Sequence, residues 1–385
     1  MSLTALVYFP SPADMRDTLP ERMQSAIAGD ISSHGPDMTS TNSRPAAATR
    51  MFQEAREAPR RVQAQLDQDA QHIARIAEAL RRFHPRAVLT SARGSSDHAA
   101  TFARYLIETH LGLVTSSASP SVSSVYRARQ DLTQCVFLVI SQSGKSPDLL
   151  AAAAAAKASG ALVVALVNVE DSPLAALADH VIPLRAGVEL SVAATKSYIC
   201  ALAAILNLVA HWSASEVLPR ALAELPAQLD AAWQLDWQAM VDMLKPARNL
   251  FVLGRGLGLG VAQEAALKLK ETCGLHAEAF SSAEVRHGPM ALMQDGLPVL
   301  LLSQDDETRQ GVEALARELS AGGVNLLLAG PSLSAVRTLP IIPAPAVVAP
   351  LLLVQTFYRW AATLAVARGF DPDHPPHLRK VTETI

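Results

Sequence analysis

The sequence repeats itself at a fixed offset, and this repeat restricts the folds that the chain can adopt. Two pairs of segments correspond: "RAVLTSARGSS" (86–96) with "NLFVLGRGLG" (249–258), and "FLVISQSG" (137–144) with "VLLLSQDD" (299–306). Arg93 matches Arg255 and Ser141 matches Ser303, so that the offset is 162 residues in both cases. Solenoid units repeat every ~20–50 residues, so this longer repeat indicates two copies of a whole domain.

Each copy alternates short apolar runs with helical segments. In the first copy the runs and the helices between them are 86–92, 98–112, 135–141, 148–160 and 161–168. Apolar strands that are separated by helices indicate a parallel sheet covered on both faces. Each copy then closes with a long helix rich in Ala and Leu. The prediction is an α/β protein with two tandem domains, each a parallel sheet flanked by helices.

Composition and helical periodicity divide the rest of the chain. The predicted organisation is a flexible leader (1–50), a helical lead-in broken at Pro59 (51–84), the first domain (85–215), a helical connector (216–245), the second domain (246–370) and a C-terminal tail (371–385).

The overall composition excludes several classes of protein. The 385 residues are 50% hydrophobic and 18% charged, which is typical of a globular chain, and the net charge of −3 provides no field for nucleic acid or an anionic membrane. Apolar runs stop well short of about 18 residues, so no membrane span is expected, and the N-terminus does not resemble a signal peptide. Three scattered cysteines without a CxxC pair indicate reduced thiols and a cytoplasmic location.

Two loops rich in Gly and Ser follow strands of the first copy, "RGSSDH" (93–98) and "SQSGKSPD" (141–148). Ligands bind at the carboxyl ends of parallel strands, and helix N-termini attract phosphate. The alternative is an ordinary turn in which Ser146 caps the helix that begins at Pro147. Lys145 either adds a charge to the loop or faces solvent. The corresponding loop of the second copy, "SQDDETRQ", carries acids that would repel phosphate, so the fold itself does not require the hydroxyl groups. This contrast favours a phosphate site in the first copy.

The second copy holds a dense group of ionisable residues at 264–289. Lys268 lies four residues after Glu264 and three before Glu271, so the three side chains share one helix face. They form either a solvated ion pair or catalytic groups directed at the ligand of the first copy. The His and Glu spacing lacks an HExxH pattern, so no metal site is predicted. The chain also lacks the GxxxxGK[ST] loop of nucleoside triphosphatases. The segment "GRGLGLG" (254–260) is only a weak match to a dinucleotide-binding loop.

The C-terminal tail contains three prolines and then Lys380. Such a tail is either frayed or folded back, and a folded tail would carry Lys380 into a site, where its amine could form a Schiff base with a sugar carbonyl.

Four segments in this order resemble the double sugar-isomerase (SIS) domain family: "SQSGKSPD", "GVELSVAATKSY", "EAALKLKETCGLHAEAFSSAEVRHGP" and "HLRKVTET". The likeness covers roughly 51–385 and is closest to the isomerase half of glucosamine-6-phosphate synthase and to stand-alone SIS-type deaminases, isomerases and deglycases. It implies tandem SIS domains of flavodoxin-like three-layer αβα form. It also implies a phosphorylated hexose or hexosamine as substrate, no redox cofactor and a homodimer.

The resemblance also implies a role for each matching residue. Glu271 would move a proton between C1 and C2, Lys268 would lie near the C2 substituent, and Lys380 would meet the open-chain carbonyl. His287 would assist ring opening across a dimer interface. The residues implied in phosphate and sugar binding are Ser95, Ser96, Ser141, Gln142, Ser143, Ser146, Val192, Ala193 and Thr195.

Several positions depart from the synthase pattern. Residue 2 is Ser where the synthase has its nucleophilic Cys, and Arg93, Lys145 and Ala194 replace a Cys, a Glu and a Ser. We therefore expect no glutamine-dependent chemistry within this chain.

The expected activity is deamination of glucosamine 6-phosphate to fructose 6-phosphate. The alternatives are another phosphosugar enzyme, such as a galactosamine-6-phosphate deaminase/isomerase or a fructosamine-phosphate deglycase, and a non-catalytic sugar-phosphate sensor.

Overall fold

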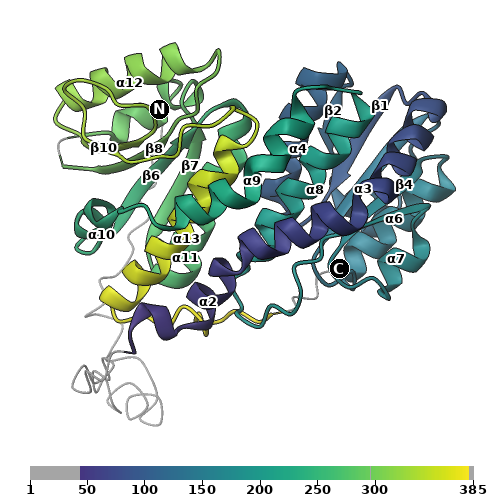
Figure 1. Cartoon of the computed structure of the whole chain (residues 1–385), viewed down its shortest axis with the longest axis horizontal. Helices are drawn as coiled ribbons and strands as arrows, with labels where there is room; N and C mark the ends of the chain where they lie inside the picture. Colours follow the sequence, from purple (N-terminus) through teal and green to yellow (C-terminus); the bar gives the residue numbers. More distant parts are fainter. Residues whose placement is uncertain (1–43, 295, 381–385) are drawn as a thin grey trace, which may run out of the picture. The chain divides into compact units, whose positions relative to one another are not determined.

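Two five-stranded parallel sheets form the framework of the protein, one in each copy of the repeat (Figure 1). The strands of the first sheet are β1 (Ala87–Ser91), β2 (Thr115–Ser117), β3 (Cys135–Ser141), β4 (Leu162–Val167) and β5 (His180–Pro183). The strands of the second are β6 (Asn249–Gly254), β7 (His276–Ser281), β8 (Pro298–Leu302), β9 (Asn325–Ala329) and β10 (Thr338–Leu339). The spatial orders are β2-β1-β3-β4-β5 and β10-β9-β8-β6-β7, which are the same order within each copy. The shared topology is the structural form of the 162-residue repeat.

The structure is a computed structural model that describes residues 44–294 and 296–380. Its α-helices are α2 (Arg50–Arg56), α3 (Ala58–Phe83), α4 (Ser95–Leu111), α5 (Pro120–Ser124), α6 (Pro147–Ala158), α7 (Pro173–Leu177), α8 (Lys196–Trp212), α9 (Leu218–Trp233), α10 (Gln238–Leu244), α11 (Leu259–Cys273), α12 (Arg309–Ala321) and α13 (Ala349–Ala367). Short 3₁₀ turns are η2 (Ala46–Ala48), η3 (Gly256–Gly258), η4 (Glu284–Arg286) and η5 (Pro289–Leu292).

The two faces of each sheet contribute to different apolar clusters. In β3 every residue is buried, with Val136, Leu138 and Ile140 in a large central cluster and Phe137 and Val139 in an outer one. The strands of the second sheet divide in the same way between the central cluster and a second outer cluster. This arrangement follows from the alternation of side chains along a strand, and it explains why the strands read as continuous apolar runs.

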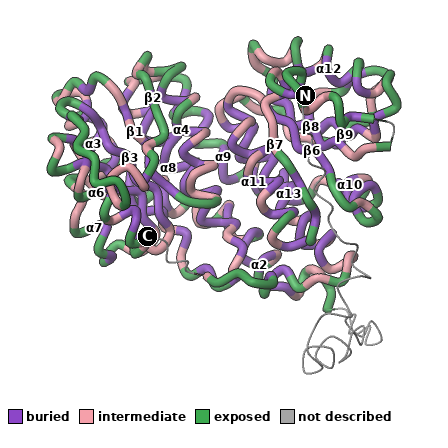
Figure 2. Tube along the Cα trace, turned by 180° about the vertical axis from the view of Figure 1, so that it is seen from behind, coloured by how far each residue is buried: buried purple, intermediate pink, exposed green. Residues whose placement is uncertain are grey.

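Helices from both copies fill the space between the sheets. Helices α8 and α13 close the two copies and are buried over most of their lengths, while α4 packs against α11 across the boundary between the copies. Figure 2 shows the central strands, such as β3, and α8 mainly in the colour of buried residues. One core therefore joins the two sheets, and it fixes the first turns of α4 and α11 next to each other.

The predicted fold class is confirmed: the protein is α/β, with two parallel sheets flanked by helices. Strands β2, β5, β7, β9 and β10 were not among the predicted apolar runs. Pro59 lies in the first turn of α3, where its fixed φ is compatible with a helix. Residues 1–43 of the predicted leader and 381–385 of the predicted tail lie outside the described residues, whereas 46–48 form η2 and α2 begins at Arg50.

The cysteines are free and buried, and burial raises the pKa of the Cys273 thiol to about 12. Within the described ranges, none of the helices combines the length and apolar character that crossing a bilayer demands.

The crossing of α4 and α11 depends on Gly260. A Cβ at this position would lie 2.4 Å from the His98 carbonyl oxygen and 3.2 Å from the Phe102 nitrogen, both of which are backbone atoms of α4. We predict that Gly260→Ala lowers the free energy of unfolding by about 1–3 kcal/mol, because the two helices must separate. Urea denaturation measures this change.

The matched control is Gly311→Ala in α12, where the nearest atom to the new Cβ is an Arg255 side-chain nitrogen at 3.7 Å. This variant should be neutral or up to ~1 kcal/mol more stable, because alanine is the better helix former. Equal effects of the two substitutions would contradict a close crossing at Gly260.

Candidate active site

A cavity of about 530 Å³ opens at the carboxyl ends of β1 and β3. In a sheet with the order 2-1-3-4-5 these are the strands between which the chain switches direction, and ligands of such sheets bind there. The lining residues are Arg93, Gly94, Ser95, Ser96, Ile140, Ser141, Gln142, Ser143, Ser146, Leu149, Val192, Ala194, Lys268, Glu271 and Lys380. Residues from both copies and from the tail therefore meet at one cavity.

The loop after β3 presents hydroxyl groups to this cavity. Ser141 Oγ accepts a hydrogen bond from the Gly144 amide at 3.1 Å, and Ser143 Oγ accepts one from the Lys145 amide at 3.3 Å. Both bonds use hydroxyl lone pairs, so each O–H can still donate to a ligand. Ser146 occupies the N-cap position of α6, but its hydroxyl makes no capping hydrogen bond. Lys145 is exposed and is not among the lining residues.

The corresponding loop of the second copy satisfies its own polar groups. Asp306 accepts hydrogen bonds from the Thr308 amide at 2.9 Å and from Gln304 Nε2 at 2.8 Å. Gln304 Nε2 also donates to the Arg255 carbonyl oxygen at 2.9 Å, and Gln304 is buried. The polar side chains of Gln304 and Asp306 are thus engaged in hydrogen bonds within the second copy.

Lys268 of α11 joins the two copies at the floor of the cavity. Its Nζ lies 2.5 Å from Glu271 Oε2, 3.1 Å from Ser95 Oγ and 3.4 Å from Glu264 Oε1. The Lys268 side chain is 1% exposed and that of Glu271 is 19% exposed, so this is not a solvated surface pair. Burial alone would lower the pKa of Lys268, but the two carboxylates outweigh it and raise the pKa. Lys268 is therefore an ammonium ion that can stabilise negative charge, not a neutral base.

Glu264 is the fully buried centre of the same network. One carboxylate oxygen accepts from Tyr358 at 2.8 Å and from Ser95 at 3.1 Å, and the other lies 3.0 Å from His98 Nδ1. Burial favours the neutral acid, but Lys268, His98 and Tyr358 together lower the pKa of Glu264, which stays ionised. The negative charge of Glu264 in turn holds Lys268 in place.

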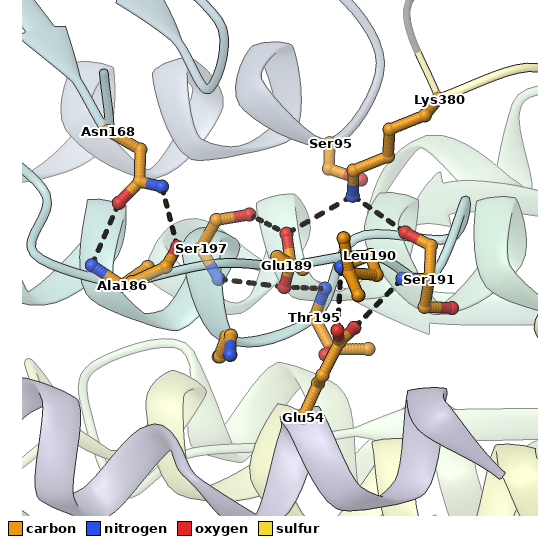
Figure 3. Close-up of polar contacts among 12 residues, drawn as sticks. Glu54, Ser95, Asn168, Ala186, Glu189, Leu190, Ser191, Thr195, Ser197 and Lys380 are labelled. Atoms are coloured by element: carbon orange, nitrogen blue, oxygen red, sulfur yellow. Dashed lines mark hydrogen bonds and ion pairs between the residues drawn. The ribbon is translucent and has the colours of Figure 1, made fainter.

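The C-terminal tail reaches the opposite wall of the cavity, where Figure 3 shows Lys380 beside Glu189 and Ser191. Lys380 Nζ donates to the Ser191 carbonyl oxygen at 2.6 Å and lies 3.6 Å from Glu189 Oε2. Glu54 of α2 binds the loop at 189–191. Its carboxylate accepts hydrogen bonds from the Leu190 amide at 2.6 Å and the Ser191 amide at 3.0 Å. Burial is the main cause of the raised pKa of Glu54.

A second contact fixes the start of the tail. The buried Asp373 carboxylate accepts from the Arg50 and Met51 amides, each at 2.8 Å, and pairs with Arg44 at 2.9 Å. These amides belong to the first turn of α2, so Asp373 satisfies N–H groups that lack a partner within the helix. The tail and the loop at 189–191 are consequently both attached to α2.

Three predicted site residues lie outside the cavity lining. Ala193 and Thr195 are buried behind it, and the Thr195 amide donates to Glu189 at 3.0 Å. His287 follows η4 and is exposed, so this chain does not bring it to its own cavity. Among residues 44–294 and 296–380, no group of three or more His, Cys, Asp and Glu side chains is arranged to hold a metal ion.

Sequence reasoning did not assign roles to His98, Tyr358 or Glu189. His98 is the last residue of the "RGSSDH" loop motif, so its position next to the serines could have marked it. Tyr358 lies in an apolar helix more than 90 residues from Glu264, with no local signal of a polar contact.

Comparison with known proteins places this site in a family. The SIS domain model matches residues 83–211 and 243–330, which correspond to the two copies. The chain belongs to the SIS domain family. The predicted membership is thereby confirmed, with one SIS match in each half of the repeat.

Individual relatives agree with this assignment. Glutamine–fructose-6-phosphate aminotransferase (isomerizing) of Legionella pneumophila is 35% identical over 303 residues, which are 75% of this chain and 50% of that protein. The chain thus spans about half the length of the curated relatives it matches. A crystal structure of a candidate phosphosugar isomerase from Silicibacter pomeroyi is 44% identical with a TM-score of 0.82, over 84% of this chain and 100% of that one. Glucosamine-6-phosphate deaminase of Thermotoga maritima shares the fold at 21% identity and a TM-score of 0.72, over 87% of this chain and 100% of that one.

Removal of Lys268 should destabilise the protein in a pH-dependent way. Lys268→Met leaves Glu264 buried without its main cation, so we predict a loss of about 3–5 kcal/mol of unfolding free energy at pH 7. In the wild type the lowered pKa of Glu264 gives stability that is present at neutral pH and is lost as the pH falls through that pKa. In Lys268→Met the buried Glu264 has lost its main cation, so its pKa should be raised. Its contribution to stability should then fall as the pH rises. The difference between the two proteins should therefore shrink on acidification.

Urea unfolding at neutral and mildly acidic pH measures this difference, with the exposed neighbour Lys270 as control. Lys270→Met should change the unfolding free energy by less than about 0.5 kcal/mol at either pH. A Lys268→Met penalty that does not vary with pH would refute the charge-pair explanation.

Proposed function

We propose that the protein is a phosphosugar deaminase/isomerase that converts glucosamine 6-phosphate and water to fructose 6-phosphate and ammonia. The observation that carries this proposal is the meeting, in one cavity, of a hydroxyl-rich loop with the Lys268–Glu271 pair. The loop fits a phosphate, and the pair fits the carbons at the other end of the same sugar. The proposal also includes action in the cytoplasm, which the three free, buried thiols support.

The chemistry needs a base that acts on carbon and an acid that stabilises oxygen or nitrogen. In the open-chain sugar, Glu271 takes the proton from C2 and returns it to C1, while O1 gains a proton and the C2 nitrogen loses one. The 2-amino aldehyde thus becomes a 1-hydroxy 2-imine. Water adds to C2 and the C–N bond breaks, so that the products are a ketone at C2 and ammonia. The Lys268 ammonium stabilises negative charge on the substrate while the proton is on Glu271.

Similarity to known proteins supports the phosphosugar part of this proposal. Relatives of this chain are named as fructose-6-phosphate aminotransferases, and proteins of the same fold as a glucosamine-6-phosphate deaminase and a tagatose-6-phosphate ketose/aldose isomerase. The direction of deamination is part of the proposal, and the turnover assay with glucosamine 6-phosphate tests it.

Glu271→Gln should abolish turnover of glucosamine 6-phosphate. Replacement of the base should lower kcat by at least ~10²-fold, since the glutamine amide cannot accept the proton. KM should change little, because the amide has the same shape as the carboxylate. The measurement couples fructose 6-phosphate formation to a dye. Glu278→Gln, an exposed carboxylate on β7, is the matched control and should behave as wild type.

Other outcomes would favour other functions. Turnover of galactosamine 6-phosphate or a fructosamine phosphate, but not of glucosamine 6-phosphate, would keep the reaction class and change the substrate. Tight sugar-phosphate binding in a thermal-shift assay, with every candidate sugar unchanged, would instead indicate a sensor.

We further propose that the protein acts as a homodimer in which His287 serves the cavity of the partner subunit. The exposure of His287 and its absence from the lining of its own cavity support this role. The exposed apolar side chain of Leu292, in the turn η5 that follows His287, fits an interface in the same region.

Mixing two inactive variants tests the shared site. Each heterodimer of Glu271→Gln and His287→Ala contains one cavity with both wild-type groups, so the mixture should recover about a quarter of the wild-type activity. Each variant alone should stay inactive. Failure to recover activity after refolding the mixture, or a fully active monomer in gel filtration, would exclude the shared site.

A further inference from the structure

Arg93 is a cation in the cavity lining to which no function is yet assigned. It lies between β1 and α4, next to Ser95 and Ser96, and its side chain is 52% exposed. Each lining cation has a carboxylate nearby: Lys268 pairs with Glu264 and Glu271, Lys380 lies near Glu189, and Arg93 pairs with Asp148. Arg93 lies on the segment that carries Ser95 and Ser96.

A buried carboxylate holds the Arg93 guanidinium in place. Arg93 Nε donates to Asp148 Oδ2 at 2.7 Å, and the Asp148 side chain is 0% exposed. The other oxygen, Oδ1, accepts from the Leu149 amide at 2.8 Å in the first turn of α6. The ion pair thus joins the loop before α4 to the start of α6, the two helices whose N-termini face the cavity.

The contact with Asp148 determines what Arg93 can add. It uses Nε, and among the described residues no hydrogen bond is found from Nη1 or Nη2. A guanidinium fork matches two non-bridging oxygens of a phosphate, whereas a lysine ammonium is a point charge. Because the Arg93–Asp148 pair is neutral overall, its contribution to binding comes from directed donors rather than from net charge.

We propose that Arg93 binds the phosphate of the substrate through its terminal nitrogens, with Asp148 as the positioning residue, and so sets the preference for phosphorylated over unphosphorylated sugars. The inference rests on the proposed function only in that the substrate carries a phosphate. It deepens that function by assigning substrate selection to a residue outside the hydroxyl loop.

The test measures binding without turnover, by calorimetric titration of the full chain with inorganic phosphate and with fructose 6-phosphate. Arg93→Gln should weaken both Kd values at least ~10-fold, which is typical for loss of a charge-assisted hydrogen bond. Arg93→Lys should weaken them nearly as much, because a single ammonium nitrogen that pairs with Asp148 cannot present two parallel donors to the phosphate as a guanidinium does. Lys145→Gln removes an exposed cation from the same region and should stay within about twofold of wild type. Circular dichroism establishes that each variant is folded.

Three results would overturn the proposal: no phosphate binding by the wild type, equal losses in Arg93→Gln and Lys145→Gln, or full retention of binding by Arg93→Lys. A wild type that binds phosphate through Arg93 but turns over no sugar would count against the proposed reaction and leave the role of Arg93 intact. If the protein is active, the ratio of kcat/KM for glucosamine 6-phosphate to that for glucosamine should fall at least ~10-fold in Arg93→Gln, through KM rather than kcat. An unchanged ratio would exclude substrate selection by Arg93.

Discussion

The buried ion cluster around Lys268 is the interaction on which the rest of the site depends. A lysine that is 1% exposed persists as a cation only because Glu264 and Glu271 lie on either side of it, and Glu264 persists as an anion only with Lys268, His98 and Tyr358 around it. Since Ser95 of the first copy bonds to both Lys268 and Glu264, the same cluster joins the two domains. The charged residues around Lys268 therefore also hold the two domains together.

Duplication produced two sheets of one topology, and the copies then took different tasks. In the first copy the serines of the loop after β3 line a cavity, while in the second copy Gln304 and Asp306 are engaged in hydrogen bonds with neighbouring residues of that copy. The second copy contributes α11 instead, whose polar face crosses to the first copy. Neither copy alone contains both the hydroxyl-rich loop and the Lys268–Glu271 pair.

Much of this arrangement could be predicted from the sequence, because its determinants are local. Apolar runs define the central strands, Gly112 and Pro59 mark helix boundaries, and the hydroxyl run of the β3 loop stands out against the acidic loop of the second copy. The edge strands β2 and β7 were missed because their solvent-facing residues are polar and no long apolar run marks them. The contacts of Glu264 with His98 and Tyr358 were missed because these residues lie on α4 and α13, which only the tertiary fold brings to α11.

The attachment of the C-terminal tail and the loop at 189–191 to α2 has a thermodynamic consequence. Glu54 holds the loop that Lys380 touches, and Asp373 of the tail closes the first turn of the same helix. Unfolding of α2 would release both the tail with Lys380 and the loop at 189–191. The unfolding equilibrium of this helix therefore depends on how much ligand is bound. A bound sugar that engages the tail therefore also lowers the frayed population of a helix more than 300 residues away along the chain.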